Sequence, residues 1–193
     1  MLRIVQYPHP ALRYESRPVA RIDDTLRGHV REMFDLMYLN RGIGLAANQV
    51  ALPFQFFIVN LTADPEQRDK EQVFINPEIV KRHASVEEEE GCLSFPGLYT
   101  KIRRARKVRV QAFDLYGNPV EIDAEDLFGR ALQHETDHLH GRLYIDLVDP
   151  EARTTINPKL RDFETAFRQA QAAGEYPNDE TIVRQLDDLA RGG

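Results

Sequence analysis

The sequence predicts an α+β fold, with helices and strands in one domain and a helical extension at the C-terminal end. Short segments rich in β-branched and aromatic residues, bounded by prolines, occur at 54–60 and 72–76 and are typical of strands. Longer segments repeat apolar residues at three- and four-residue steps, which is typical of helices packed on a core. Because 193 residues fit one such domain, we predict a domain at 1–150 and an extension at 151–193.

Composition and charge exclude several classes of protein. The chain is 42% apolar and 29% charged, and no apolar run approaches the ~20 residues that a membrane-spanning helix needs. The first residues contain no long apolar stretch, so we expect no signal peptide, no membrane association and a cytoplasmic location. The formal net charge of −6 argues against specific DNA binding, because phosphate groups bind to positive surfaces.

One basic run, KIRRARK at 101–107, departs from the acidic balance of the chain. We interpret it as a solvated strand edge, since charged side chains protect such edges from pairing with other chains. Transient contact with a ribosome or another RNA is the second interpretation.

The first 42 residues predict an irregular lead-in followed by a helix. Prolines and arginines are frequent in 1–20, which favours irregular structure. Apolar residues then recur with helical spacing over 22–37. We expect Asp23 or Asp24 to cap the start of this helix and the sequence NRG at 40–42 to end it.

Small residues dominate two segments that lie far apart in the sequence. The first, GIGLAANQV at 42–50, lets another segment or a ligand approach its backbone closely. It lacks the Gly-Lys-Ser/Thr ending of a phosphate-binding loop. Close packing explains its glycines and alanines but not Gln49, whose amide can donate hydrogen bonds. The second segment, GCLSFPG at 91–97, combines small residues with turn formers.

Further extended segments are predicted in the middle of the chain. Residues 77–82 should continue the strand structure after Pro77. The alternating segment 107–114 and the segment 120–122 are expected to form a hairpin, because Gly, Asn and Pro lie between them. We interpret the acidic run EEEE at 87–90 as a solvated turn, with Glu90 close enough to the following cysteine to hydrogen-bond near it.

The longest well-defined helical pattern lies at 123–141. Asp123 and Asp126 resemble a capping arrangement, apolar residues follow at helical steps, and Gly141 ends a helix of about five turns. A short strand is predicted at 143–145. Two amphipathic helices are expected in the C-terminal extension, packed on the domain or on a partner.

The predicted helix carries the pattern HExxH at 134–138. On a helix, His134 and His138 lie one turn apart with about 5–6 Å between their Cβ atoms, which lets two imidazoles bind one metal ion. Glu135 would lie beside that ion and could take a proton from a water molecule there. The alternative is a solvated helix face that carries two histidines without a ligand.

The sequence alone leaves the third metal ligand open. A catalytic site of this type has three protein ligands, and HExxH provides two of them. Cys92 is the only cysteine, so it cannot form an internal disulfide, and it could be a ligand, a nucleophile or a buried small apolar residue. Cys92 is the strongest candidate ligand, with Glu90, Asp137 and His140 as alternatives. Asp137 faces away from the two histidines and is more suited to orienting the helix.

Three segments, in this order, resemble the signature motifs of the peptide deformylase family. They are GIGLAANQ at 42–49, EGCLS at 90–94 and QHETDHLHG at 133–141. The segment YPHPALR at 7–13 extends the resemblance, which covers residues 1–148. Each motif alone is weak to moderate support, but three of them in the family's order are very specific.

The resemblance implies both a fold and a cofactor. The fold is an α+β domain in which mostly antiparallel sheets surround the helix that carries HExxH. The cofactor is one divalent metal ion bound by Cys92, His134 and His138. This ion would be Fe²⁺ in the cell, and Zn²⁺, Ni²⁺ or Co²⁺ could replace it in isolated protein.

The resemblance also implies a reaction. The family hydrolyses the N-formyl group of the N-terminal formylmethionine of newly synthesised polypeptides and releases formate, so the expected partner is a nascent formylated polypeptide. Glu135 would be the acid and base of this reaction. Gln49 and the backbone N–H of Leu93 would stabilise the negative charge that develops on the formyl oxygen.

For the substrate, the resemblance implies an extended peptide bound along the backbone near Gly44, with the methionine side chain in an apolar pocket. The residues expected at this binding site are Ile43, Gly44, Gly91, Leu127 and Ala131. Arg130 departs from the apolar residue that some members carry at this position, and it could narrow or polarise the mouth of the pocket.

Two other functions share the HExxH pattern. An endopeptidase would use Glu135 and both histidines, but it would normally have a histidine or an acidic residue as third ligand. A non-enzymatic domain could use a metal only to hold its fold together, which requires four protein ligands and no exchangeable water.

Overall fold

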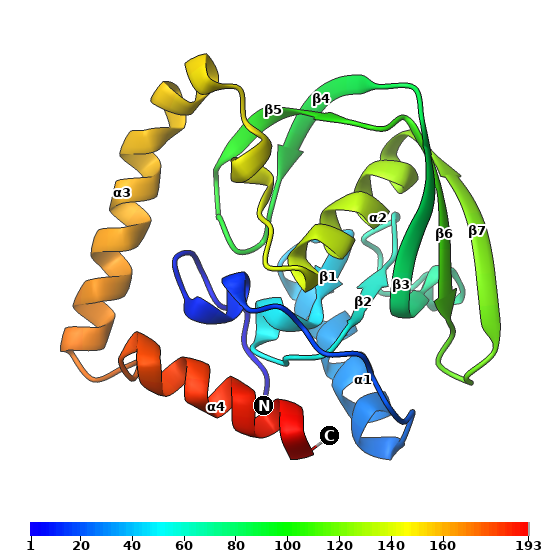
Figure 1. Ribbon diagram of the computed structural model, residues 1–193, viewed down its shortest axis with the longest axis horizontal. Coiled ribbons are helices and arrows are strands. Elements are labelled where there is room, and N and C mark those ends of the chain that lie inside the picture. Colours follow the sequence, from blue (N-terminus) through cyan, green and yellow to red (C-terminus); the bar gives the residue numbers. More distant parts are fainter. Residues whose placement is uncertain (193) are drawn as a thin grey trace.

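Two antiparallel sheets lie around a central helix in the computed structural model, which describes residues 1–192 (Figure 1). The larger sheet has five strands in the order β1-β2-β3-β6-β7, and the smaller one pairs β4 with β5. The strands are β1 (Gly44–Ala46), β2 (Phe56–Val59), β3 (Gln72–His83), β4 (Val86–Gly91), β5 (Tyr99–Arg104), β6 (Lys107–Phe113) and β7 (Pro119–Glu125). The α+β fold with antiparallel sheets is therefore confirmed.

Four α-helices complete the described part of the chain: α1 (Asp24–Leu39), α2 (Asp126–Leu139), α3 (Pro150–Ala172) and α4 (Asp179–Gly192). Figure 1 shows α2 in the middle of the molecule, between the β4–β5 pair and the strands β3, β6 and β7. Helices α3 and α4 follow the outside of the molecule, as expected for a helical extension. Among residues 1–192, no helix is both long and apolar enough to cross a lipid bilayer.

Strand β2 explains how the core is divided around the larger sheet. Its four residues, FFIV, are all buried. Alternate side chains of a strand point to opposite faces. Phe57 and Val59 accordingly belong to the apolar cluster that contains Leu132 and Leu139 of α2, whereas Phe56 and Ile58 belong to the cluster that contains α1. Because β2 is covered on both faces, its sequence is a continuous apolar run.

Helix α1 forms where the sequence predicts it. The Asp23 carboxylate caps its start by accepting a hydrogen bond from the backbone N–H of Leu26 at 2.9 Å. The chain leaves the helix through Asn40. The periodic apolar residues of this helix form its buried face, namely Leu26, Val30, Met33, Phe34 and Met37.

The acidic run at 87–90 is a strand, so its interpretation as a solvated turn is wrong. It lies in β4, where Glu87 pairs with Arg103 and Glu89 pairs with Lys101 of β5. Opposite charges across an antiparallel pair contribute roughly 0.2–1 kcal/mol each. The basic run predicted as a strand edge is therefore the partner of the acidic run.

Helix α2 begins later than predicted. Residues 123–125 belong to β7, and the helix runs for 14 residues from Asp126 to Leu139. Asp123 does not cap the helix, because its carboxylate accepts two hydrogen bonds from Arg109 on β6, each 2.7 Å long. Cross-strand pairing therefore extends the hairpin by three residues beyond the predicted end at 122.

The strand predicted at 143–145 is also wrong. Residues Tyr144–Leu147 form one turn of 3₁₀ helix. Asp146 explains this turn, because its carboxylate accepts hydrogen bonds from the backbone N–H of Leu143 at 2.9 Å and from Arg13. By contrast, the extended segment predicted after Pro77 is present as the continuation of β3, with irregular register against β6 at this point.

The C-terminal helices pack on the N-terminal segment through their apolar faces. Ile156, Leu160 and Phe167 of α3, with Ile182 and Leu186 of α4, lie in one buried cluster with residues from the N-terminal segment and from β5. The side-chain hydroxyl of Tyr14 donates a hydrogen bond to Asp187 of α4 at 2.8 Å, which adds a polar contact to this packing.

His9 is buried inside this C-terminal packing. Its ring centroid lies 5.7 Å from that of Phe167 and 5.4 Å from that of Tyr176, and its Nδ1 accepts a hydrogen bond from the backbone N–H of Ala11. Burial, helped by the charge of Arg3, lowers the pKa of His9 to about 4. The folded protein therefore holds this imidazole neutral.

The contribution of His9 to stability should fall as the pH falls from about 6.5 to 4, because the unfolded chain binds a proton on His9 that the folded chain does not bind. This difference lowers the free energy of unfolding by about 2 kcal/mol between pH 7 and pH 5. Urea unfolding of wild type and His9→Phe at both pH values measures it. The variant should lose about 2 kcal/mol less than wild type; equal losses in the two proteins would contradict the prediction.

Candidate active site

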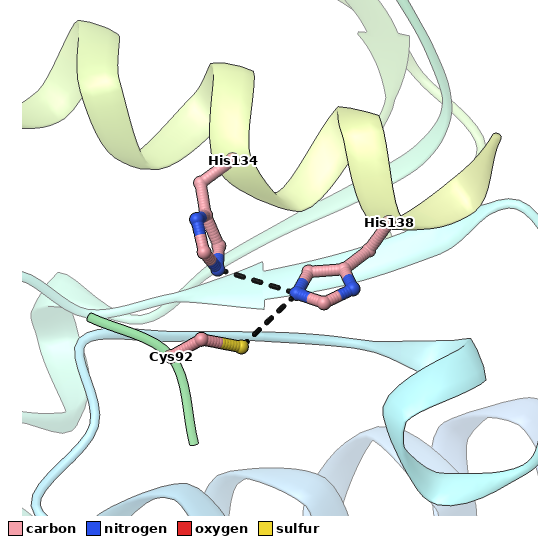
Figure 2. Close-up of side chains that lie close together, drawn as sticks. All are labelled: Cys92, His134 and His138. Carbon is pink, nitrogen blue, oxygen red and sulfur yellow. Dashed lines mark hydrogen bonds between the residues drawn. The ribbon is translucent and has the colours of Figure 1, made fainter. Parts of the chain in front are cut away.

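Three potential metal-binding side chains converge beside α2. His134 and His138 project from one face of the helix, and Cys92 reaches them from the segment that follows β4 (Figure 2). The Nε2 atom of His138 lies 3.2 Å from Nε2 of His134 and 3.3 Å from Sγ of Cys92. One ligand atom from each residue lies within 4.8 Å of the others. Two imidazoles and one thiol with this spacing can bind a single metal ion.

The other candidates for the third ligand face elsewhere. Glu90 contacts Nδ1 of His134, whereas Nε2 of the same ring faces Nε2 of His138. Asp137 accepts a hydrogen bond from Arg104 at 2.7 Å. His140 is exposed at the end of α2. Of the four residues considered from the sequence, the structure therefore brings only Cys92 together with the two histidines.

A buried carboxylate holds His134 in place. Oε1 of Glu90 lies 2.6 Å from Nδ1 of His134. Arg104 donates two hydrogen bonds to the same carboxylate, at 2.7 and 2.8 Å, and Arg130 donates one at 3.0 Å. Burial alone would raise the pKa of Glu90, but the hydrogen bonds from Arg104 and His134 keep it well below its usual value. The carboxylate thus stays ionised and can fix the proton of His134 on Nδ1.

Replacing Glu90 with glutamine should destabilise the protein strongly. The change removes the buried carboxylate that Arg104 and Arg130 share and leaves them only the more exposed Asp137 and Glu88, which costs about 3–5 kcal/mol. Urea unfolding of metal-free protein at pH 7 measures the loss. Glu89→Gln is the matched control, because Glu89 is the exposed neighbour in the same strand and should change stability by less than about 1 kcal/mol. A loss of equal size in both variants would disprove the prediction.

Glu135 lies on the same helix, beside the two histidines. Its side chain is buried, and burial raises the pKa of Glu135 to about 7. A Cβ atom at Gly44 would lie only 2.5 Å from Oε1 of Glu135, so a side chain at this position would displace the carboxylate. Within residues 1–192, Oε2 of Glu135 has no hydrogen-bond partner. A carboxylate with a pKa near neutrality and a free oxygen is suited to accept and return a proton.

The two histidines differ in their charge preference. Burial would lower the pKa of His134, but its hydrogen bonds with Cys92 and Glu90 raise it above the usual value. Burial lowers the pKa of His138, and the neighbouring His134 lowers it further. His138 is therefore held neutral, the form in which an imidazole binds a metal.

Gln49 directs its amide group into the same site. Oε1 of Gln49 accepts a hydrogen bond from the backbone N–H of Ala46 at 2.8 Å, and Nε2 lies 3.1 Å from Oγ of Ser94 and 3.3 Å from Sγ of Cys92. Because the oxygen is held by the backbone, the NH₂ group must face the cysteine. A donor is thus fixed beside the converging metal-ligand atoms.

A cavity of about 260 Å³ opens onto these groups. Every residue that the sequence predicts for substrate binding lines it: Ile43, Gly44, Gly91, Leu127 and Ala131. The cavity is also lined by Leu93, Gln49, Glu135, Cys92 and His134, but not by His138. The predicted site residues therefore form one site, although they come from three distant segments.

Sequence reasoning missed several contributors to this site. Arg104 is buried against Glu90 and Asp137, although the basic run around it predicts solvated side chains. Tyr99 lines the cavity from β5, and Ser94 orients Gln49. Ser94 lies in the EGCLS motif at 90–94, so the sequence carries a signal for this residue. Arg130, expected at the pocket mouth, is a buried part of the cavity wall that also binds Glu90.

The sequence of this chain is similar to the sequences of known peptide deformylases. Residues 1–166 match the family model described as polypeptide deformylase. The peptide deformylase of Rhodopirellula baltica is 39% identical over 184 residues, which cover 95% of this chain and 91% of that protein. Peptide deformylase 1 of Pseudomonas syringae is 43% identical over 161 residues, covering 83% of this chain and 94% of the relative.

Solved structures show the same similarity in three dimensions. A crystal structure of a peptide deformylase from Legionella pneumophila has a TM-score of 0.78 and 39% identity, covering 87% of this chain and 98% of that one. A peptide deformylase from Arabidopsis thaliana, solved in complex with an inhibitor, has a TM-score of 0.85 and 37% identity, covering 89% and 94%.

Proposed function

This chain belongs to the polypeptide deformylase family, and from that premise we propose that it removes the N-formyl group from the N-terminal formylmethionine of newly synthesised polypeptides. The products are formate and a polypeptide with a free amino group. The observation that carries the proposal is the convergence of Cys92, His134 and His138 beside Glu135 and a cavity. We expect the protein to act in the cytoplasm on chains leaving the ribosome.

The residues present fit one divalent metal ion. Two imidazole nitrogens and a thiol sulfur converge, and the cavity beside them leaves space for a further, non-protein ligand. Glu90 accepts a hydrogen bond from the Nδ1–H of His134, which leaves the lone pair of the ring on Nε2, facing the other two ligand atoms. When bound, the metal supplies Lewis acidity, polarising a carbonyl oxygen and lowering the pKa of a water molecule. We propose Fe²⁺ as the ion in the cell.

Glu135 is proposed to transfer the proton in this reaction. Its carboxylate takes a proton from the attacking water, whose oxygen forms a bond to the formyl carbon. When the bond between that carbon and the methionine nitrogen breaks, the same carboxyl returns the proton to the nitrogen. The pKa of about 7, raised by burial, suits both roles near neutral pH.

Gln49 and the backbone of Leu93 are proposed to stabilise the charge on the formyl oxygen. The NH₂ group of Gln49 is fixed by contacts on both ends of its amide, so it needs no reorientation during the reaction. A preoriented donor of this kind contributes roughly 3–4 kcal/mol of transition-state stabilisation. Leu93 lines the cavity next to Cys92, where its N–H can serve as a second donor.

The peptide is proposed to bind along β1 near Gly44, with the methionine side chain in the cavity. β1 lies at an edge of the larger sheet, so an extended peptide can pair with its backbone. Ile43, Leu127 and Ala131 supply apolar wall, and Gly91 leaves room beside them. Leu127 is half exposed, which leaves apolar surface for a substrate to cover.

The direct test is formate release from formyl-Met-Ala-Ser by protein loaded with Fe²⁺ or Co²⁺ under anaerobic conditions. We expect formate in proportion to the amount of active protein, with little release by Glu135→Ala at equal metal content. Wild-type release no higher than that of the variant would refute the proposal. Cleavage of internal peptide bonds without formate release would identify an endopeptidase instead.

A further inference from the structure

The end of α2 that carries His138 is held by two residues from other segments. The side-chain amide of Asn48 donates a hydrogen bond to the backbone carbonyl of His138. The backbone N–H of Ser16 donates one to the carbonyl of Leu139 at 2.9 Å. These two carbonyls belong to the last turn of the helix, and the carbonyl of His138 also accepts a hydrogen bond from the backbone N–H of Gly141 at 2.9 Å. Asn48 and Ser16 therefore meet at the turn from which the His138 side chain projects.

Three buried polar atoms at this turn lack a hydrogen-bond partner in the described part of the chain. They are Nδ1 of His138, Oδ1 of Asn48 and Oγ of Ser16. The orientation of the Asn48 amide is determined by chemistry, because the carbonyl of His138 accepts only and must face the NH₂ group. The amide oxygen is thus free to accept a second hydrogen bond.

The two histidines are supported differently. Nδ1 of His134 faces the carboxylate of Glu90 at 2.6 Å, which fixes its proton there. No carboxylate among residues 1–192 is hydrogen-bonded to Nδ1 of His138. Yet His138 needs the same arrangement, because its Nε2 faces Sγ of Cys92 and must present a lone pair to a metal. Its proton then lies on the buried Nδ1, which requires an acceptor.

We propose that Asn48 is a positioning residue for His138, and that it receives the Nδ1–H of His138 through one buried water shared with Ser16. A buried water makes about three hydrogen bonds to otherwise unpaired polar groups, which matches these three atoms in number. Asn48 thus fixes both the backbone of His138, through its NH₂ group, and the tautomer of the ring, through its oxygen. The inference rests on the proposed function, since it assigns His138 as a metal ligand.

The test measures zinc affinity and the His138 proton separately. Metal-free protein is titrated with Zn²⁺ against a competing chelator, and the Nδ1–H signal of His138 is followed by ¹⁵N NMR in zinc-loaded protein. Asn48→Leu removes both hydrogen-bonding groups at nearly constant volume and should raise the Kd for Zn²⁺ about 10–100-fold. Ser16→Ala keeps the backbone bond to Leu139 and should shift the Nδ1–H signal and speed its exchange with water.

Asn60 provides the matched control. It is fully buried, and its side-chain amide donates hydrogen bonds to Gln67 and Tyr38, which are outside α2, so Asn60→Ala should leave both the zinc Kd and the His138 signal unchanged. Wild-type zinc affinity in Asn48→Leu overturns the inference. So does weakened affinity in that variant together with an unchanged Nδ1–H signal in Ser16→Ala, which would show that only the backbone contact matters. If the wild type itself binds no zinc, the proposed metal site fails as well.

Discussion

Glu135→Gln is expected to lower kcat for formate release by about 10²–10⁴-fold, the usual contribution of a positioned acid or base. Glutamine has nearly the same shape as glutamate, but it cannot accept a proton from water. The side chain is buried and its free oxygen has no partner elsewhere in residues 1–192, so the neutral amide should not unfold the protein. Formate release at saturating formyl-Met-Ala-Ser measures the effect.

Two control measurements test whether a lower kcat in Glu135→Gln comes from the loss of the acid and base. Metal content of the variant should equal that of wild type, since Glu135 is not among the three converging ligands. Glu87→Gln changes an exposed carboxylate of the same acidic run that lies outside the cavity lining, and it should keep kcat within about twofold of wild type. A Glu135→Gln protein that retains more than a tenth of wild-type kcat would contradict the acid–base role.

Gln49→Leu should lower kcat by about 10²–10³-fold, because it removes one donor to the developing oxygen charge. KM should change much less, since the hydrogen bond strengthens only as the charge develops. Steady-state kinetics with formyl-Met-Ala-Ser separate the two constants.

Metal content must be measured in the same Gln49→Leu samples, because Nε2 of Gln49 also lies 3.3 Å from Sγ of Cys92. With full metal content, a loss confined to kcat supports the proposed role. A variant that keeps its metal and shows a raised KM with unchanged kcat would instead assign Gln49 to substrate binding.

The helix with HExxH and the position of its two histidines on one face could be predicted from the sequence because their information is local. A three- and four-residue period places His134 and His138 on one face of a helix wherever that helix lies. Cys92 is the strongest candidate for the third ligand because it is the single cysteine and lies in a Gly-Cys-Leu-Ser turn. The resemblance to a family then joined Gln49 to them, which no rule of spacing could do.

The support around Glu90 could not be predicted. A glutamate in a run of four looks solvated, because charged side chains are rarely buried unless they are paired. Its partners Arg104 and Arg130 are 14 and 40 residues away, so the pairing exists only in the folded chain. The same difficulty applies to Asn48, whose contact with His138 spans 90 residues.

The errors in secondary structure have similar causes. Three apolar residues at 143–145 do not distinguish a short strand from a tight turn. The turn forms because Asp146 binds the backbone of Leu143 and the side chain of Arg13, more than 130 residues away. Likewise, Asp123 could cap a helix or pair across a hairpin, and Arg109 on the neighbouring strand decides between them.

The most direct measurement is an anaerobic titration of metal-free protein with Co²⁺, with formate release from formyl-Met-Ala-Ser followed at each addition. If Cys92, His134 and His138 hold one catalytic ion, the rate should rise linearly to one equivalent of Co²⁺ and then level off. Cys92→Ala should show no such rise. Formate release that is independent of Co²⁺, or equal in wild type and Cys92→Ala, would contradict a metal-dependent deformylase site on these residues.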